Sequence, residues 1–227
     1  MTLEQNKATW AAHNWLRDGE EWAAWWSDSV TQWKFTILPR IRQFLSVDTI
    51  LEIGPGCGRQ TQFLIEHCRR LIGVDITPEC VARCRERFPG HEFILGDGIS
   101  LDGIHDHSID FAFSFDSLPH ADQYVMGHYL SQLARKLKIG GVAWLHHSNA
   151  GTVADSHGWR DEKMTAEKFR VECVRAGLFV ACQELVDWES DKLTDCFSTV
   201  QTISVSETTV RVNDGFRLEM AKARAAA

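Results

Sequence analysis

Apolar and polar positions along the chain form blocks that predict strands alternating with helices. Apolar runs that end near residues 53, 75, 95, 115 and 146 have the length and composition of buried strands. Amphipathic segments between them predict helices near 59–67, 78–88 and 122–137. A repeated strand–helix order is typical of a parallel sheet with right-handed crossovers. The pattern therefore predicts an α/β protein with a mostly parallel sheet.

The second half of the chain predicts how this sheet ends. A threonine-capped amphipathic helix is expected over 165–176. Two β-rich runs follow, over 178–188 and 196–204, and the polar residues between them predict a turn. An antiparallel pair at one edge completes a Rossmann-like sheet, for which seven strands are expected. The core is expected over 46–206 and a C-terminal tail over 207–227, whose alanine-rich residues 221–227 are expected to be a frayed helix or disordered.

Tryptophan is concentrated before this core, with six of the nine tryptophans in the first 33 residues. Several recur at helical spacing, so residues 1–45 are predicted to form a helical cap. Two interpretations are open: the rings pack against the helical layer of the sheet, or they form a mobile cover over a ligand pocket. Trp33 and Phe35 lie nearest the first strand and are expected to reach that pocket as substrate contacts.

Composition excludes some function classes. A net charge of −7 has the wrong sign for gripping a nucleic-acid backbone. The sequence has no apolar stretch long enough for a membrane span and its first residues lack a signal peptide, so we expect a cytoplasmic protein. Seven cysteines, an odd number, are expected to be reduced thiols. A small-molecule substrate is expected, and a homodimer is possible.

A glycine-rich turn follows the first predicted strand. Glu52 precedes glycines at positions 54, 56 and 58. Dinucleotide-binding folds use the spacing G-x-G-x-x-G, which would need a glycine at position 59, where Arg59 stands. The spacing therefore favours a different nucleotide cofactor, one whose cationic end would lie near the Glu52 carboxylate.

Two further acids stand at the ends of the next strands. Asp75 follows an apolar strand, where a carboxylate accepts hydrogen bonds from ribose hydroxyls, and Asp97 ends the third strand. Together with the turn, these acids resemble motif I and the following strands of the class I S-adenosylmethionine-dependent methyltransferases, over roughly residues 49 to 150. The resemblance implies S-adenosylmethionine as cofactor, with Asp97 placed to receive the adenine amine. The implied cofactor-binding residues are Glu52, Gly54, Gly56, Gly58, Asp75, Ile76, Asp97, Gly98, Phe115, Asp116 and Ser117.

The methyl acceptor is expected beyond the fourth and fifth strands, because ligands of open α/β sheets bind at the carboxyl ends of the strands. His120 is the first candidate for general base, since a hydroxyl acceptor must lose its proton and histidine titrates near neutrality. A structural role in capping the next helix is the alternative. His146 is the second catalytic candidate. Neighbouring residues of a strand face opposite sides of the sheet, so only one of His146 and His147 should reach the acceptor. The other expected substrate contacts are Tyr124, His147 and Asn149.

The reaction and its acceptor have several interpretations. Asp116, His146 and Asn149 could imitate a divalent-cation site, but the ligand types match poorly, and no metal is predicted. Residues 36–41, 113–118 and 145–149, with the tryptophan-rich start, resemble bacterial methyltransferases that accompany glycosyltransferases in polysaccharide loci. That resemblance implies O-methylation of a sugar or secondary metabolite. N-methylation of a small amine, and a non-catalytic scaffold that only keeps the cofactor fold, are the alternatives.

Overall fold

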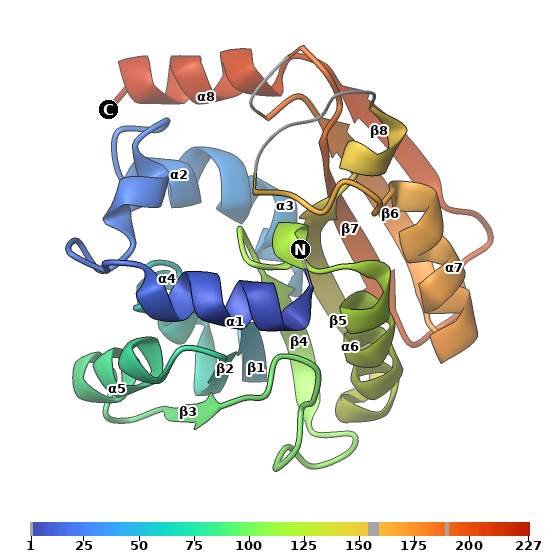
Figure 1. The fold of residues 1–227 in the computed structure, drawn as a ribbon. Coiled ribbons are helices and arrows are strands. Elements are labelled where there is room, and N and C mark those ends of the chain that lie inside the picture. The colour runs from blue at the N-terminus through green and yellow to red at the C-terminus, as the bar shows by residue number, and fades with distance from the viewer. Residues whose placement is uncertain (1, 154–158, 189–190) are drawn as a thin grey trace.

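The chain folds around one eight-stranded sheet in the computed structural model, which describes residues 2–153, 159–188 and 191–227. The strand order is β3-β2-β1-β4-β5-β7-β6-β8 (Figure 1). Strands β1 to β5 pair in parallel, and β7 runs antiparallel to both β5 and β6. The strands are β1 (Val47–Ile53), β2 (Cys68–Asp75), β3 (Glu92–Leu95), β4 (Ile109–Ser114), β5 (Leu137–Ser148), β6 (Phe179–Val186), β7 (Asp195–Gln201) and β8 (Thr209–Asn213).

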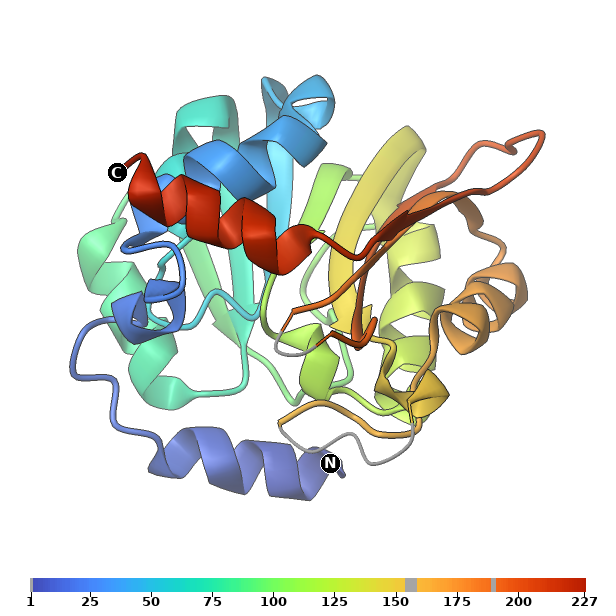
Figure 2. The ribbon, with the colours of Figure 1, turned by 90° about the horizontal axis from the view of Figure 1, so that it is seen from above.

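Helices cover both faces of the sheet (Figures 1 and 2). Strand residues alternate between the two layers: Leu51 and Ala112 pack with one, Ile50 and Phe111 with the other. The first layer holds α6 (Gln123–Lys136) and α7 (Ala166–Ala176). The second holds α2 (Ser29–Gln32), a π-helical turn (Trp33–Ile37), α3 (Leu38–Ile41), α4 (Thr61–Leu64), α5 (Pro78–Arg87) and α8 (Phe216–Ala225).

Helix α1 (Leu3–Ala12) lies outside both layers, across the carboxyl ends of the strands (Figure 2). It starts with a capping box, in which the side chains of Thr2 and Gln5 accept each other's backbone N–H. The side chain of Asn6 donates a 2.9 Å hydrogen bond to the carbonyl of His120. Leu3 covers Gly98, where an added Cβ would lie 2.6 Å from its side chain. These contacts dock α1 on the loops after β3 and β4.

The two interpretations of the tryptophan-rich segment apply to different parts of it. From Trp26 onward the segment belongs to the core, since Trp26, Trp33, Ile37 and Ile41 are buried in the second helical layer. Trp33 stacks on Phe63 with ring centroids 5.2 Å apart. Only the residues before Trp26 extend over the ends of the strands.

The C-terminal segment corrects the expected strand number and the expected tail. Strand β8 adds an eighth strand by pairing in parallel with β6. Helix α8 follows it, and Phe216, Met220 and Ala223 recur at helical spacing on its buried face. The alanine-rich composition of the last residues hid this apolar stripe, so residues 207–227 complete the fold instead of trailing from it.

A buried ion pair joins three distant parts of the second layer. The Arg40 guanidinium lies 2.6 Å from a Glu184 oxygen on β6 and 2.9 Å from a Glu219 oxygen on α8. Its side chain is 15% exposed, so the charges are largely shielded from water. Breaking a shielded pair leaves an uncompensated charge behind.

We therefore predict that Arg40→Ala lowers the free energy of unfolding by about 3 kcal/mol or more, because two carboxylates lose their shared partner. Urea denaturation followed by circular dichroism measures the change. The matched control is Arg69→Ala, which removes a pair with Asp48 from a side chain that is 77% exposed. That control should leave the midpoint unchanged. Equal effects of the two variants would contradict the role given to Arg40.

Candidate cofactor and methyl-acceptor site

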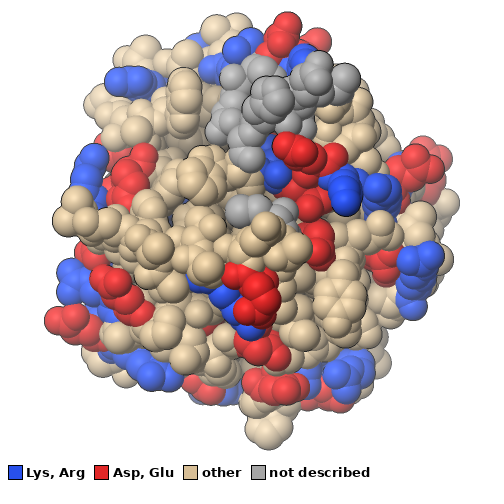
Figure 3. Space-filling view, in the orientation of Figure 1, with Lys and Arg blue, Asp and Glu red and all other residues tan. Residues whose placement is uncertain are grey.

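A cavity of about 360 Å³ lies at the carboxyl ends of β1, β2 and β4. The strand order reverses between β1 and β4, and open α/β sheets bind ligands at such a reversal. The cavity walls come from the loops after these strands, the N-terminal residues before Trp26, and Trp159, Arg160 and Trp188. Figure 3 shows the molecule in the orientation of Figure 1, where uncharged side chains form a large area and charged groups lie both near the middle of the face and at its edge.

The glycine turn after β1 forms the floor of the cavity. Gly54 and Gly56 both have positive φ angles, 70° and 56°, which favour glycine. A Cβ on Gly54 would lie 2.0 Å from the hydroxyl oxygen of Ser117, so no other residue fits without displacing the loop after β4. The predicted residues Gly54, Gly56, Phe115, Asp116 and Ser117 line the cavity together. Gly58 is not among the lining residues, and Phe88 packs where its side chain would be.

Asp75 ties the end of β2 to the glycine turn. One carboxylate oxygen accepts the backbone N–H of Gly56 at 2.9 Å, and the other accepts that of Thr77 at 2.8 Å. The side chain is buried, and burial raises its pKa above the ordinary value despite these hydrogen bonds. Asp75 lines the cavity with Ile76 beside it, the position expected of a ribose acceptor.

Glu52 places a second buried carboxylate in the cavity wall. Its side chain is 2% exposed and accepts a 2.6 Å hydrogen bond from the Thr61 hydroxyl. Burial, together with the nearby charge of Asp75, raises the pKa of Glu52 to about 7. Glu52 therefore gains or loses its proton within the physiological pH range.

Asp97 differs from its expected placement. Its Oδ1 accepts the backbone N–H groups of Ile99 and Ser100, at 2.9 and 2.7 Å. Burial would raise its pKa, but these hydrogen bonds outweigh burial and hold it below the ordinary value. Gly98 lines the cavity and Asp97 does not. The carboxylate shapes the loop after β3, and the backbone of that loop forms the wall.

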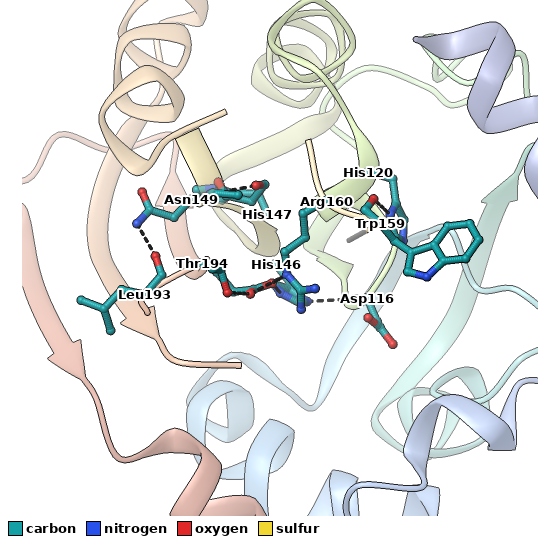
Figure 4. Close-up of polar contacts among 12 residues, drawn as sticks. Asp116, His120, His146, His147, Asn149, Trp159, Arg160, Leu193 and Thr194 are labelled. Atoms are coloured by element: carbon teal, nitrogen blue, oxygen red, sulfur yellow. Dashed lines mark hydrogen bonds and ion pairs between the residues drawn. The ribbon is translucent and has the colours of Figure 1, made fainter. Parts of the chain in front are cut away.

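His120 lines the cavity beneath α1. Its Nδ1 forms a short hydrogen bond with the carbonyl of Trp159 (Figure 4), and its ring lies 5.0 Å from that of Trp10. A carbonyl can only accept, so Nδ1 carries the proton and Nε2 of the neutral ring carries the lone pair. Burial lowers the pKa of His120 below the ordinary histidine value. The ring is therefore neutral, with a basic nitrogen, at neutral pH.

His146 lies behind the cavity wall, which corrects its assignment as a catalytic group. It is fully buried, and both ring nitrogens have partners: Nδ1 accepts the Asp116 N–H at 3.1 Å, and Nε2 lies 2.9 Å from an Asp195 oxygen. Asp195 is held in turn by Arg160, whose Nε donates to both of its carboxylate oxygens. The ring supports the loop after β4 and cannot reach an acceptor.

The other predicted substrate contacts lie outside the cavity. His147 stacks on Phe169 with ring centroids 4.0 Å apart, and burial lowers its pKa to about 3. Asn149 holds the start of α7 by accepting the Ala166 N–H at 2.9 Å. Tyr124 is exposed on α6, and neither Trp33 nor Phe35 lines the cavity. Helix and strand periodicity indicated the end of the sheet near which these residues lie, but not the direction in which their side chains point.

Several lining residues were not predicted. Arg59 donates to Asp116 at 2.9 Å and to Gln32 at 3.1 Å, linking the glycine turn to the loop after β4. The sequence did offer one signal for Arg59: it stands at the position where a dinucleotide-binding turn has its third glycine. Trp10, Trp15, Trp22 and Trp159 form an aromatic wall. Their concentration was visible in the sequence, but not which rings face inward.

Within residues 2–153, 159–188 and 191–227, no group of His, Cys, Asp and Glu side chains is arranged to hold a metal ion. In the same part of the chain, no helix has the length and apolar character needed to cross a membrane.

Comparison with solved structures identifies the architecture. An S-adenosylmethionine-dependent methyltransferase from Clostridium acetobutylicum superposes with a TM-score of 0.62 at 15% identity, over 77% of this chain and 92% of that one. The fold is that of a class I methyltransferase. S-adenosylmethionine is the cofactor expected for it, as the glycine turn predicted. Residues 50–141 also match a family model for the methyltransferase domain.

Sequence relatives match parts of the chain. A probable dimethyladenosine transferase of Dictyostelium discoideum is 36% identical over 66 residues, covering 26% of this chain and 21% of that protein. Trans-aconitate 2-methyltransferase of Acidovorax sp. (strain JS42) is 31% identical over 126 residues, covering 50% and 46%. The chain thus spans between about a fifth and a half of the length of these curated relatives.

Loss of the Asp75 carboxylate should weaken cofactor binding. Hydrogen bonds to a charged group contribute roughly 1.5 to 3 kcal/mol, so Asp75→Ala should raise the dissociation constant tenfold or more. Calorimetric titration with S-adenosylhomocysteine measures it. Asp110→Ala removes a strand carboxylate away from the cavity, on β4, and serves as control. Unchanged affinity in Asp75→Ala, or tight binding of NAD by the wild type, would contradict the assignment.

The titration of Glu52 should appear in cofactor binding. Ionised Glu52 attracts a sulfonium, so affinity for S-adenosylmethionine should increase several-fold as the pH rises through about 7. S-adenosylhomocysteine has a neutral sulfur and should show a smaller increase. Glu52→Gln should abolish the difference between the two ligands.

The same substitution gives a check on folding. A carboxyl whose pKa is raised on folding contributes stability below its ordinary value of 4.5 and loses that contribution as the pH rises through about 7. Glu52→Gln should therefore be at least as stable as the wild type at pH 8. A ligand difference that persists in this variant would show that another group titrates.

Proposed function

We propose that this protein transfers the methyl group of S-adenosylmethionine to a hydroxyl of a small molecule, with His120 as general base. Sugars and secondary metabolites are the acceptors that the sequence resemblance suggests. The observation that carries the proposal is the hydrogen bond from Nδ1 of His120 to the Trp159 carbonyl. It leaves Nε2 as a basic nitrogen in a cavity of a class I methyltransferase fold.

The residues around the cavity fit the cofactor. Gly54 allows the glycine turn to approach Ser117 in the loop after β4 closely, and Asp75 provides carboxylate oxygens at the position expected for ribose hydroxyls. Glu52 adds a charge that complements a cation. When bound, the cofactor supplies an electrophilic methyl group on a sulfonium.

The protein's own contribution to the transfer would be to position the acceptor and remove its proton. An acceptor hydroxyl beside His120 would donate to Nε2 and pass its proton there as the oxygen–methyl bond forms. The Trp159 carbonyl would then stabilise the protonated ring, because Nδ1–H already donates to it. The aromatic wall would exclude water from the displacement.

A buried network would keep the loop after β4 in place for this reaction. Asp116 adopts a left-handed conformation with φ of 61°, unusual for a residue other than glycine. Its backbone donates to His146, and its carboxylate pairs with Arg59 at 2.9 Å. Strain held by several partners is common where a loop must present groups to a ligand.

The relatives' names suggest other acceptors. A nucleic-acid acceptor is disfavoured by the net charge of −7, and the dimethyladenosine transferase match covers only 26% of the chain. A small amine remains the second candidate, favoured by the acidic cavity residues Glu21, Glu52, Asp75 and Asp116. Mass spectrometry of products formed with deuterated-methyl cofactor, from sugars, phenols and amines, separates O- from N-methylation. Cofactor binding without any product would favour the scaffold alternative.

Replacement of His120 tests the base directly. His120→Ala should lower kcat by roughly 10² to 10⁴, with cofactor affinity nearly unchanged. His120→Asn keeps a hydrogen bond but takes no proton at neutral pH, so it should be almost as poor. In the wild type, kcat should rise with pH through a midpoint below 6.5 and be level by pH 7, because burial lowers the pKa of His120.

His128→Ala on the exposed side of α6 is the control and should keep full activity. Recovery of most activity in His120→Asn would reduce His120 to an orienting contact.

A further inference from the structure

Aromatic rings dominate the part of the cavity around His120. Trp10 is at their centre, with ring centroids 6.0 Å from Trp22 and 6.4 Å from Trp159. Phe115 and Trp188, whose ring centroids are 5.6 Å apart, also line the cavity. Flat rings of this kind offer stacking and edge contacts to another ring.

Several polar groups in this region already bind one another, although three buried atoms, Asn6 Oδ1, Trp15 Nε1 and Glu21 Oε2, have no hydrogen-bond partner among the described residues. Arg59 pairs with Asp116, and Arg160 pairs with Asp195 at 2.6 Å. The Asn6 amide nitrogen donates to the His120 carbonyl. A sugar has several hydroxyls, each of which needs a partner when it leaves water. An acceptor made mostly of an aromatic ring would leave these ion pairs and this hydrogen bond intact.

The base also favours one kind of hydroxyl. Nε2 of His120 belongs to a buried, weakly basic imidazole. A phenol ionises near pKa 10, as tyrosine does, whereas an aliphatic hydroxyl resembles water, at about 15.7. The pKa of a phenol is therefore about six units lower than that of an aliphatic hydroxyl, so a weak base removes its proton more easily.

We infer that the acceptor is a flat aromatic hydroxyl, stacked among Trp10, Trp22 and Trp159 with its oxygen at Nε2 of His120. The inference rests on the proposed methyl transfer and narrows its substrate class. The acceptor oxygen forms a bond to the methyl carbon as the methyl–sulfur bond breaks. Its proton goes to Nε2, and the electron pair of the broken bond stays on sulfur.

Three test acceptors distinguish the effect of an aromatic ring from the effect of an acidic hydroxyl. 2-Naphthol has both, 2-naphthylmethanol has the ring with an aliphatic hydroxyl, and methyl glucopyranoside has hydroxyls without a ring. With the full chain and labelled S-adenosylmethionine, 2-naphthol should be methylated with kcat/KM roughly a hundredfold above the other two. 2-Naphthylmethanol should bind and inhibit competitively, and the glucoside should do neither.

Substitution of Trp10 tests ring recognition. Trp10→Leu should raise KM for 2-naphthol by about fivefold or more with little change in kcat, and Trp10→Phe should restore most of the affinity. Phe44→Leu removes a ring of comparable burial that packs on Phe111, away from the cavity, and should change neither constant. Equal KM values in Trp10→Leu and the wild type would overturn the inference.

A binding measurement without turnover distinguishes recognition of an aromatic ring from the proposed methyl transfer. 2-Methoxynaphthalene has no transferable proton, and with S-adenosylhomocysteine present it should quench tryptophan fluorescence in the wild type but not in Trp10→Leu. If it binds this way and no acceptor is methylated, ring recognition stands and the proposed transfer fails. If the glucoside or an amine is methylated in preference, the transfer activity stands and the aromatic acceptor is wrong.

Discussion

The close approach between the glycine turn after β1 and the loop after β4 is the constraint on which the cavity depends. At Gly54 there is no room for a Cβ, because the Ser117 hydroxyl oxygen lies within 2.0 Å of where it would be. Asp75 holds the other side of the turn through the Gly56 N–H. With both contacts in place, the ends of β1, β2 and β4 form one continuous wall. Widening the turn by a single side chain would separate the groups expected to bind ribose from those expected to face the reactive methyl.

Buried polar pairs keep this wall in position from behind. The Asp116 backbone, His146, Asp195 and Arg160 form a chain of contacts that joins β4, β5, β7 and the segment before α7. Every link lies in a region of low dielectric, where a satisfied pair is strong and an unsatisfied group is costly. Such a network suits a loop that must keep a left-handed residue, Asp116, in place. It also explains why a histidine so near the cavity has no role at its surface.

Local sequence signals located one part of the cavity wall. A glycine turn and an acid at the end of the next strand are set by neighbours within a few residues, and Gly54, Gly56 and Asp75 line the cavity together. The part of the cavity around His120 depends on long-range packing. Arg160 reaches the cavity because it pairs with Asp195, 35 residues later, and no spacing rule indicates that contact. Periodicity showed a tryptophan-rich helical segment, but the division between Trp10 in the wall and Trp33 in the core follows from the position of α1. Strand β8 was missed because it is short and its side chains are mostly exposed, although Val210 and Val212 alternate with polar residues.

A crystal structure of the protein grown with S-adenosylhomocysteine tests the central claim most directly. The account predicts the ribose hydroxyls within hydrogen-bonding distance of the Asp75 carboxylate, the adenine against the loop after β3, and the sulfur facing the side of the cavity that holds His120. Nucleotide density elsewhere on the molecule, or a ribose that has no contact with Asp75, would contradict it.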